Sequence, residues 1–242
     1  MFFDEVSVLA VFGRLARKIP APYNPWAQVE THRIPVPFNS TGGTFVQAFH
    51  NQYRKTGTLI VVTTAIDAVE RAINVLAVAA HTPVVYGSVV GKGDIGRVFR
   101  VIPGATACYQ CILDAQAADP ASFPQFGPDE NGADPDRAYH QGGIPGLGLD
   151  VEIVANFVAR MALQTLGKMA PTLGISDAQG DHLLWSNNIR GNHFDHPLQL
   201  RWERFPRSAE CRVCGQGARP VDNPSDVAYQ VAELEKLLGS LR

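Results

Sequence analysis

The chain has 242 residues, of which 45% are hydrophobic and 18% charged, a composition typical of a folded protein with a sizeable core. The formal net charge of −2 provides no general attraction to nucleic acid or to an anionic membrane surface. The longest apolar run, residues 72–80, is too short to span a bilayer, and the acidic Asp4 and Glu5 argue against a secretory signal. We therefore expect a cytoplasmic protein with no nucleic-acid or membrane partner.

Hydrophobic periodicity predicts alternating helices and strands in the first part of the chain. Helices are predicted over residues 4–19, 45–55 and 68–80, and strands over residues 28–34, 58–66 and 83–86. The continuous β-rich run at 58–66 is typical of a strand that is buried on both faces. Strand, helix and strand in this order indicate a crossover in a parallel sheet. The predicted fold class is therefore α/β, with a doubly wound, mainly parallel sheet.

The second part of the chain contains a long irregular segment between regular elements. Gly91, Gly93 and Gly96 predict a turn. Residues 117–148 are rich in Pro, Gly, Asp and Gln and lack periodicity, as functional loops often do. Asp150 is the predicted N-cap of a helix over 151–166 that ends at Gly167. The remaining predicted elements are strands over 97–102, 182–186 and 198–205 and a terminal helix over 225–241.

All four cysteines fall into two pairs with a two-residue spacer. The pairs are Cys108 with Cys111 and Cys211 with Cys214. This spacer lets both thiolates of a pair face one point, and two such pairs complete a tetrahedron around zinc. In a reducing cytoplasm, paired thiols favour metal binding over disulfides. A redox dithiol and a chance pairing of buried cysteines are the alternatives. With every ligand position filled by protein, a bound zinc would be structural.

Several segments resemble, in the same order, the ThiF, MoeB and HesA adenylyltransferases, which are bacterial relatives of the ubiquitin-activating enzymes. They are the strand at 58–66, Asp67, Arg71, Asn74, the segments 83–87 and 96–98, the Pro-Gly turn at 103–104 before the first cysteine pair, the glycine-rich segment 142–146 and the second cysteine pair. The resemblance covers roughly residues 58–215. It implies a Rossmann-like fold with a C-terminal β extension stapled by zinc.

Enzymes of this family use ATP and magnesium to adenylate the C-terminal carboxylate of a small ubiquitin-like or sulfur-carrier protein, and they work as dimers. The resemblance implies the same cofactors and partners here, with a homodimer or a hetero-oligomer. Asp67 matches the family's magnesium-binding aspartate and is the candidate catalytic and cofactor-binding residue. A helix N-cap is the alternative explanation of Asp67, and its position predicts that role equally well.

The sequence departs from the family pattern in three respects. Residues 1–57 contain no Gly-x-Gly-x-x-Gly loop between a strand and a helix. When Asn74 and Pro83 are aligned, Asp67 lies about two residues later than the family pattern places its aspartate. With all four cysteines assigned to zinc, none remains to form a thioester. We therefore expect that this chain forms no thioester by itself.

These departures leave two functions open. We interpret residues 1–170 as an incomplete Rossmann-like adenylation core that includes a crossover loop at 117–148. Residues 171–242 then contain the C-terminal β segment, the second cysteine pair and the terminal helix. Such a chain is an adenylyltransferase that needs a further nucleotide-binding part or a partner, or it is a non-catalytic zinc-stabilised scaffold or partner subunit. The balanced charge disfavours a zinc-ribbon protein that binds nucleic acid.

Overall fold

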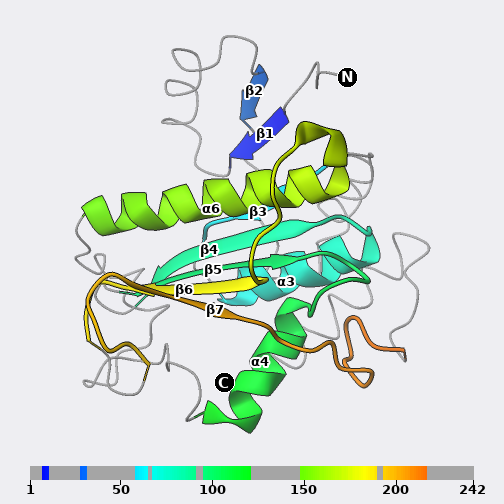
Figure 1. The fold of residues 1–242 in the computed structure, drawn as a ribbon. Coiled ribbons are helices and arrows are strands. Elements are labelled where there is room, and N and C mark those ends of the chain that lie inside the picture. The colour runs from blue at the N-terminus through cyan, green and yellow to red at the C-terminus, as the bar shows by residue number, and fades with distance from the viewer. Residues whose placement is uncertain are drawn as a thin grey trace.

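The computed structural model describes residues 7–10, 28–31, 58–64, 67–90, 95–120, 148–189 and 193–216 (Figure 1). The helices are α3 (Asp67–Ala79), α4 (Tyr109–Ala118), α6 (Gly148–Met169) and the 3-10 helix η2 (Pro171–Leu173). The strands are β1 (Ser7–Ala10), β2 (Gln28–Thr31), β3 (Ile60–Val62), β4 (Val84–Val90), β5 (Ile95–Val101), β6 (His182–Ser186) and β7 (Gln199–Glu203). The predicted helices at 45–55 and 225–241 and the glycine-rich segment 142–146 lie outside the described residues.

A five-stranded sheet in the order β3-β4-β5-β6-β7 forms the centre of the fold. Within this sheet, β3 and β4 pair in parallel and the other three pairs are antiparallel. Strands β1 and β2 form a separate, parallel pair. The prediction of a mainly parallel sheet is therefore wrong for the five-stranded sheet. Strand β4 ends at Val90 and β5 begins at Ile95, so only four residues connect them. A parallel crossover needs a dozen or more residues, so this short connection dictates a hairpin.

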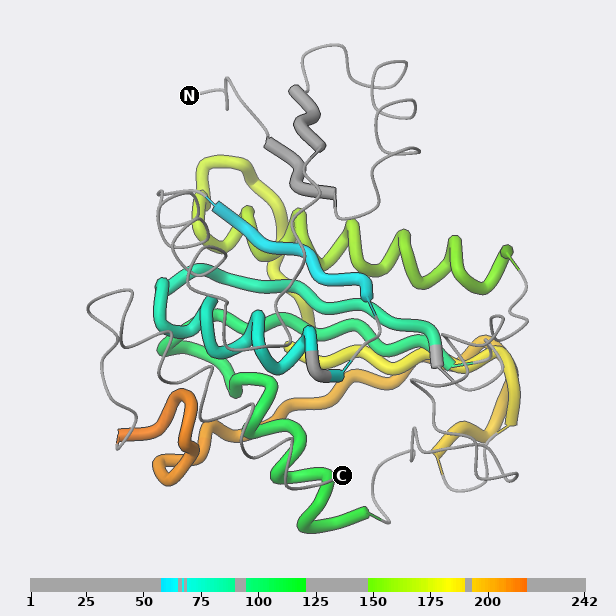
Figure 2. Tube along the Cα trace, turned by 180° about the vertical axis from the view of Figure 1, so that it is seen from behind, coloured from blue at the N-terminus to red at the C-terminus, as the bar shows by residue number. Residues whose placement is uncertain are grey.

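Helices cover both faces of the sheet, which confirms the α/β class. In Figures 1 and 2, α6 lies on one face, and α3 and α4 lie on the other. Each face has its own apolar cluster: Phe99 and Ile112 belong to the one beneath α3 and α4, and Val85 and Met161 belong to the one beneath α6. In the described part of the chain, no helix is long and apolar enough to cross a membrane.

Two glycines allow α6 to approach the sheet closely. A Cβ atom added to Gly87 on β4 would lie 2.1 Å from Cγ2 of Val158, and one added to Gly96 on β5 would lie 2.3 Å from Cγ2 of Val154. Gly96 therefore lies inside a strand, and its assignment to a turn is wrong. The glycine supplies space for the facing helix instead of a special backbone conformation.

Local signals misplace several element boundaries. Ser7–Ala10 is a strand, so the helix predicted over 4–19 is wrong there, because a short apolar run does not distinguish the two structures by itself. Helix α6 begins before Asp150, which is buried and accepts a hydrogen bond from Asn187 Nδ2 at 2.8 Å instead of capping the helix. Gly167 lies within α6 and packs against Ile175, so it does not end the helix.

The segment from β3 through α3 to β4 is the crossover that the periodicity predicts. It confirms a strand, a helix and a parallel strand in that order. The strand is shorter than predicted, and it is an edge strand of the described sheet, so Val61 is 45% exposed. The prediction of burial on both faces is therefore wrong for Val61. Asp67, the first residue of α3, follows the carboxyl end of β3.

Candidate metal centre and the polar site beside it

The four cysteines, here called the cysteine cluster, come together from distant parts of the chain. They are Cys108, Cys111, Cys211 and Cys214, and their Sγ atoms all lie within 4.8 Å of one another. The Sγ distances are 3.9 Å from Cys108 to Cys111, 3.6 Å from Cys108 to Cys211 and 3.4 Å from Cys111 to Cys214. All four are free thiols, and among the described residues theirs is the one group of this kind suited to a metal ion.

Each cysteine pair is shaped by its local backbone. Cys108 is the N-cap of α4, and Cys111 lies in the first turn of that helix, so both side chains face the same side. The second pair closes a tight turn in which the Gly215 N–H donates to the Cys211 carbonyl at 2.8 Å. A Cβ atom on Gly215 would lie 2.4 Å from the Ala209 carbonyl oxygen, so this turn excludes any larger residue.

The geometry of the cysteine cluster fits a tetrahedral zinc ion. With Zn–S bonds of about 2.3 Å, the sulfurs of a regular tetrahedron lie about 3.8 Å apart. The three Sγ distances given above, between 3.4 and 3.9 Å, bracket that value. The Val213 N–H also donates to the Cys211 sulfur at 3.4 Å, a bond of the kind that stabilises a thiolate. A zinc held here would have no open coordination position.

Without a cation, the buried thiols resist full ionisation. Burial raises the pKa of Cys111 to about 11, and the hydrogen bond with Cys211, together with burial, raises the pKa of Cys108 well above its usual range. The hydrogen bond from Cys108 lowers the pKa of Cys211 to about 5. Four thiolates this close together repel one another, so a divalent cation is the natural partner of the fully ionised cluster.

Asp67, the predicted catalytic residue, contacts the side chain of Tyr109, the residue after Cys108. Its Oδ1 accepts a hydrogen bond from the Tyr109 hydroxyl at 2.9 Å, and its Oδ2 lies 2.6 Å from Nε of Arg71. Tyr109 is the neighbour of Cys108, and its backbone N–H donates to Asn74 Oδ1 at 3.0 Å. The Asp67 side chain is 43% exposed. It is therefore oriented by two neighbours and still accessible to solvent.

A buried ion pair extends this polar site into the core. Nη2 of Arg97 lies 2.9 Å from Oε2 of Glu70 and 3.4 Å from the Tyr109 hydroxyl. The Arg97 guanidinium also lies over the rings of Phe99 and Tyr109, at 5.2 and 5.4 Å from their centroids. Burial acts to lower the pKa of Arg97, but Tyr109 and Glu70 outweigh it and raise the pKa. Arg97 is therefore charged, and it links α3, β5 and α4.

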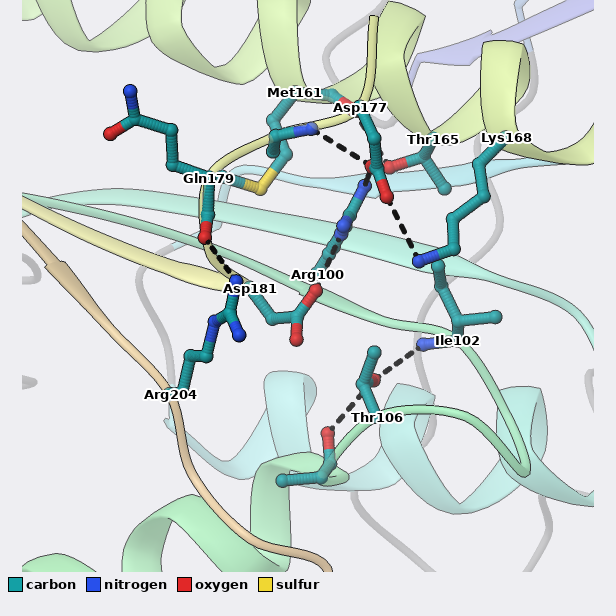
Figure 3. Close-up of polar contacts among 12 residues, drawn as sticks. Arg100, Ile102, Thr106, Met161, Thr165, Lys168, Asp177, Gln179, Asp181 and Arg204 are labelled. Carbon is teal, nitrogen blue, oxygen red and sulfur yellow. Dashed lines mark hydrogen bonds and ion pairs between the residues drawn. The ribbon is translucent and has the colours of Figure 1, made fainter. Parts of the chain in front are cut away.

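A second buried arginine fixes the segment that leads into β6. Figure 3 shows Asp177 between Arg100 and Lys168, with Asp181 on the other side of the Arg100 guanidinium. Arg100 Nη1 lies 2.6 Å from Asp177 Oδ1, and its Nε lies 2.8 Å from Asp181 Oδ1. Lys168 Nζ lies 3.0 Å from Asp177 Oδ2. These contacts hold the segment after α6 against β5.

This arrangement predicts a pH dependence of stability. Burial acts to raise the pKa of Asp177, but the hydrogen bonds from Arg100 and Lys168 outweigh it and lower the pKa from 3.8 to about 2. The stabilisation is present above pH 4 and is lost as the pH falls toward 2. Because the carboxylate is 44% exposed, we expect Asp177→Asn to cost about 0.5–1 kcal/mol at neutral pH.

Urea unfolding of both proteins at several pH values checks this expectation, since effects of pH elsewhere cancel in the difference. The difference in the free energy of unfolding should shrink as the pH falls from 4 to 2.5. A difference that stays constant over that range would mean that the ion pair does not set the pKa of Asp177.

The fold and the cysteine cluster together define a mixed α/β protein with a site suited to a structural metal. The profile of the ThiF family matches residues 16–201, which is more than half of the chain. The protein therefore belongs to the ThiF family. A comparison with curated protein sequences finds no match.

Solved structures with a similar fold include the E. coli protein MccB. Its crystal structure superposes with a TM-score of 0.53 at 16% sequence identity, covering 82% of this chain and 48% of MccB. The structure of E. coli MccB with AMPCPP and selenomethionine MccA gives a TM-score of 0.53 at 14% identity, covering 81% of this chain and 48% of that one. The likeness is one of fold, and this chain spans about half the length of MccB.

Sequence reasoning missed several residues that build these sites. Glu70 and Arg97 form the buried pair, and Tyr109 connects that pair to Asp67. Their one signal in the sequence is weak: a glutamate in an apolar helix and an arginine in an apolar strand each need a partner when buried. Arg207 and Arg212 carry no such signal, because both are exposed and their contacts depend on how the two cysteine pairs meet.

Proposed function

We propose that this protein acts in adenylation of the ThiF type, in which the C-terminal carboxylate of a small ubiquitin-like or sulfur-carrier protein is activated with ATP. The nucleotide-binding part would come from residues other than those described or from a partner subunit. The placement of Asp67 carries the proposal. Asp67 follows the carboxyl end of β3, and β3 pairs with β4 in parallel. Open α/β sheets bind their ligands at the carboxyl ends of such strands.

The Asp67 side chain itself suits a hard cation. Carboxylate oxygens are the ligands that magnesium prefers, and Asp67 remains 43% exposed. The Tyr109 hydroxyl holds Oδ1, so the carboxylate keeps one orientation before any ligand arrives. ATP would supply a phosphate leaving group that makes the carrier carboxylate reactive. Asp67 would bind the magnesium that accompanies ATP.

The family and the similar structures support a substrate with a peptide terminus. E. coli MccB has been crystallised with AMPCPP and with MccA. For this chain we infer the same two kinds of ligand, an adenine nucleotide and a polypeptide. We further propose zinc in the cysteine cluster, a homodimer or a hetero-oligomer as the working form, and a cytoplasmic location.

Magnesium-ATP binding tests the proposal directly. We expect the zinc-loaded chain, alone or mixed with its partner, to bind magnesium-ATP in isothermal titration calorimetry. Asp67→Asn keeps the acceptor for Tyr109 but removes the charge, and it should weaken binding by about tenfold or more. Glu152→Gln, which changes an exposed carboxylate on α6, should bind as the wild type does. Equal affinity in all three proteins would exclude Asp67 from the nucleotide site.

A non-catalytic scaffold or partner subunit is the second candidate. It is favoured by the ion pair between Asp67 and Arg71, because a guanidinium 2.6 Å from the carboxylate competes with a metal ion for it. A scaffold would retain zinc and its fold but bind no magnesium-ATP. Native mass spectrometry with and without magnesium-ATP distinguishes the two functions, since only the adenylating form gains the mass of the nucleotide.

A further inference from the structure

Residues 207–214, here called the second cysteine segment, contain two exposed arginines. Both donate hydrogen bonds to the segment around the first cysteine pair. Arg207 precedes the second pair by four residues. Its Nη1 donates to the carbonyl oxygen of Gly104 at 2.7 Å, and its Nη2 donates to the carbonyl oxygen of Cys214 at 2.9 Å. One guanidinium therefore spans the turn before the first pair and the last cysteine of the second pair. Arg207 and Gly104 are 103 positions apart in sequence.

Arg212 makes a second tie between the same segments. It lies between Cys211 and Cys214, and its Nη2 donates to Oε1 of Gln110 at 3.0 Å. Gln110 lies directly before Cys111 and is buried. The amide nitrogen of Gln110 donates to Asp114 Oδ1 at 2.7 Å, which turns its oxygen toward the arginine. This tie therefore ends on a side chain whose own orientation is fixed.

The acceptor for Arg207 is presented by a rigid turn. Gly104 has a φ of +84°, a conformation that residues with a side chain rarely adopt. The turn is closed by the Ala105 and Thr106 N–H groups, which both donate to the Ile102 carbonyl at 2.9 and 3.0 Å. The Thr106 hydroxyl accepts from the Ile102 N–H at 2.8 Å. The Gly104 carbonyl thus points outward at a fixed place beside the first cysteine pair.

The positive charges of the two arginines offset the negative charge of a metal-loaded cysteine cluster. Four thiolates around a divalent cation have a net charge of about −2. Arg207 bonds to the Cys214 carbonyl and Arg212 bonds to the residue before Cys111, so each brings one positive charge next to a cysteine pair. Groups behind the ligands of a metal orient them and tune the metal's affinity. A planar fork with several donors suits this better than a lysine, which bonds as a point charge.

We propose that Arg207 and Arg212 are positioning residues for the metal in the cysteine cluster. They hold the two cysteine pairs at binding distance and offset the charge of the thiolates. This inference rests on the proposed zinc binding. These bonds hold the two cysteine pairs together before the metal binds, so metal binding costs less conformational entropy. The metal therefore dissociates more slowly.

The rate at which zinc leaves the full-length chain tests the proposal. Zinc release to a chromogenic chelator is followed for the wild type, Arg207→Ala, Arg212→Ala and the double variant. We expect about tenfold faster release for each single change and about a hundredfold for the double change. Arg204→Ala is the matched control, because Arg204 is also exposed and donates to a carbonyl, that of Gln179 at 2.8 Å, away from the cysteine cluster. It should release zinc at the wild-type rate.

Arg207→Lys separates geometry from charge. It keeps the positive charge but cannot bond two carbonyls as a fork, so we expect release close to that of Arg207→Ala. If Arg207→Lys released zinc at the wild-type rate, the pair of hydrogen bonds from the guanidinium to the two carbonyls would not be what slows zinc release. The cobalt-loaded proteins supply a second readout, since their absorption spectrum reports the coordination geometry whether or not the release rate changes.

The outcomes distinguish this inference from the proposed zinc site. If the wild type holds no metal, the zinc site itself fails. If the wild type holds zinc and the arginine variants release it no faster than Arg204→Ala does, the positioning role fails and the zinc site stands. Urea unfolding of the zinc-loaded variants accompanies both measurements. Release that accelerates only in proportion to global unfolding would assign the arginines to general stability and overturn the positioning role.

Discussion

One zinc ion per chain should be found in the purified protein, and removing it should destabilise the fold by several kcal/mol. The cysteine cluster joins α4 to a segment 103 residues further on, so the metal closes a long loop. Structural zinc in small zinc-finger peptides supplies about 10–16 kcal/mol of apparent binding free energy, most of which appears as folding free energy. Elemental analysis gives the zinc content, and thermal unfolding with and without a chelator gives the loss.

Single substitutions localise this effect. Cys211→Ser should lose most of the zinc and melt at a temperature close to that of the chelated wild type. Glu210→Gln alters the exposed neighbour of Cys211 and should retain both zinc and stability. All measurements are made under reducing conditions, so that disulfides do not contribute. A metal-free wild type that melts cooperatively and does not respond to the chelator would show that the cysteine cluster holds no structural metal.

Glu70→Ala should cost about 3–5 kcal/mol, the largest effect that we expect from a single change away from the cysteine cluster. The glutamate is 1% exposed, and its partner Arg97 is 9% exposed. Truncating Glu70 removes the carboxylate that lies 2.9 Å from the buried guanidinium, so a charge in the core loses its counter-ion there. At roughly 2–4 °C per kcal/mol for a chain of this size, the melting temperature should fall by about 6–20 °C.

A double substitution distinguishes the cost of an unpaired charge from the value of the pair. Glu70→Leu with Arg97→Met replaces the pair with apolar groups of similar size and should be far less destabilising than Glu70→Ala. Arg71→Ala breaks the partly exposed pair with Asp67 and should cost less than about 1 kcal/mol. If Glu70→Ala and Arg71→Ala lowered the free energy of unfolding by the same amount, the buried pair would contribute no more to stability than the partly exposed one.

Glu70→Ala also bears on the candidate nucleotide site. Arg97 contacts the Tyr109 hydroxyl, and that hydroxyl orients Asp67. A change in the core pair therefore reaches Asp67 through a single tyrosine, which is itself the neighbour of Cys108. The candidate metal centre and the candidate nucleotide site thus share one structural element, the first turn of α4.

Local patterns in the sequence were sufficient for the features that depend on neighbours along the chain. The two-residue spacer of each cysteine pair places both sulfurs on one side of a turn, so the four candidate ligands, which come together in the fold, could be chosen without a structure. Helical spacing located α3 and α6 to within a few residues, because one apolar face must meet the core. The resemblance to the ThiF family also followed from the order of local motifs, and the family profile confirms it.

The tertiary structure decided the direction of the strands and the contacts between distant residues. Continuous apolar strands read alike in parallel and antiparallel sheets, and it was the short connection from β4 to β5 that imposed antiparallel pairing. Gly96 resembled a turn residue until α6 was seen to pack on it. Contacts such as Glu70 with Arg97 and Arg207 with Gly104 join residues 27 and 103 positions apart. Periodicity extends over only a few turns, so pairings at such separations are set by the packing of whole elements.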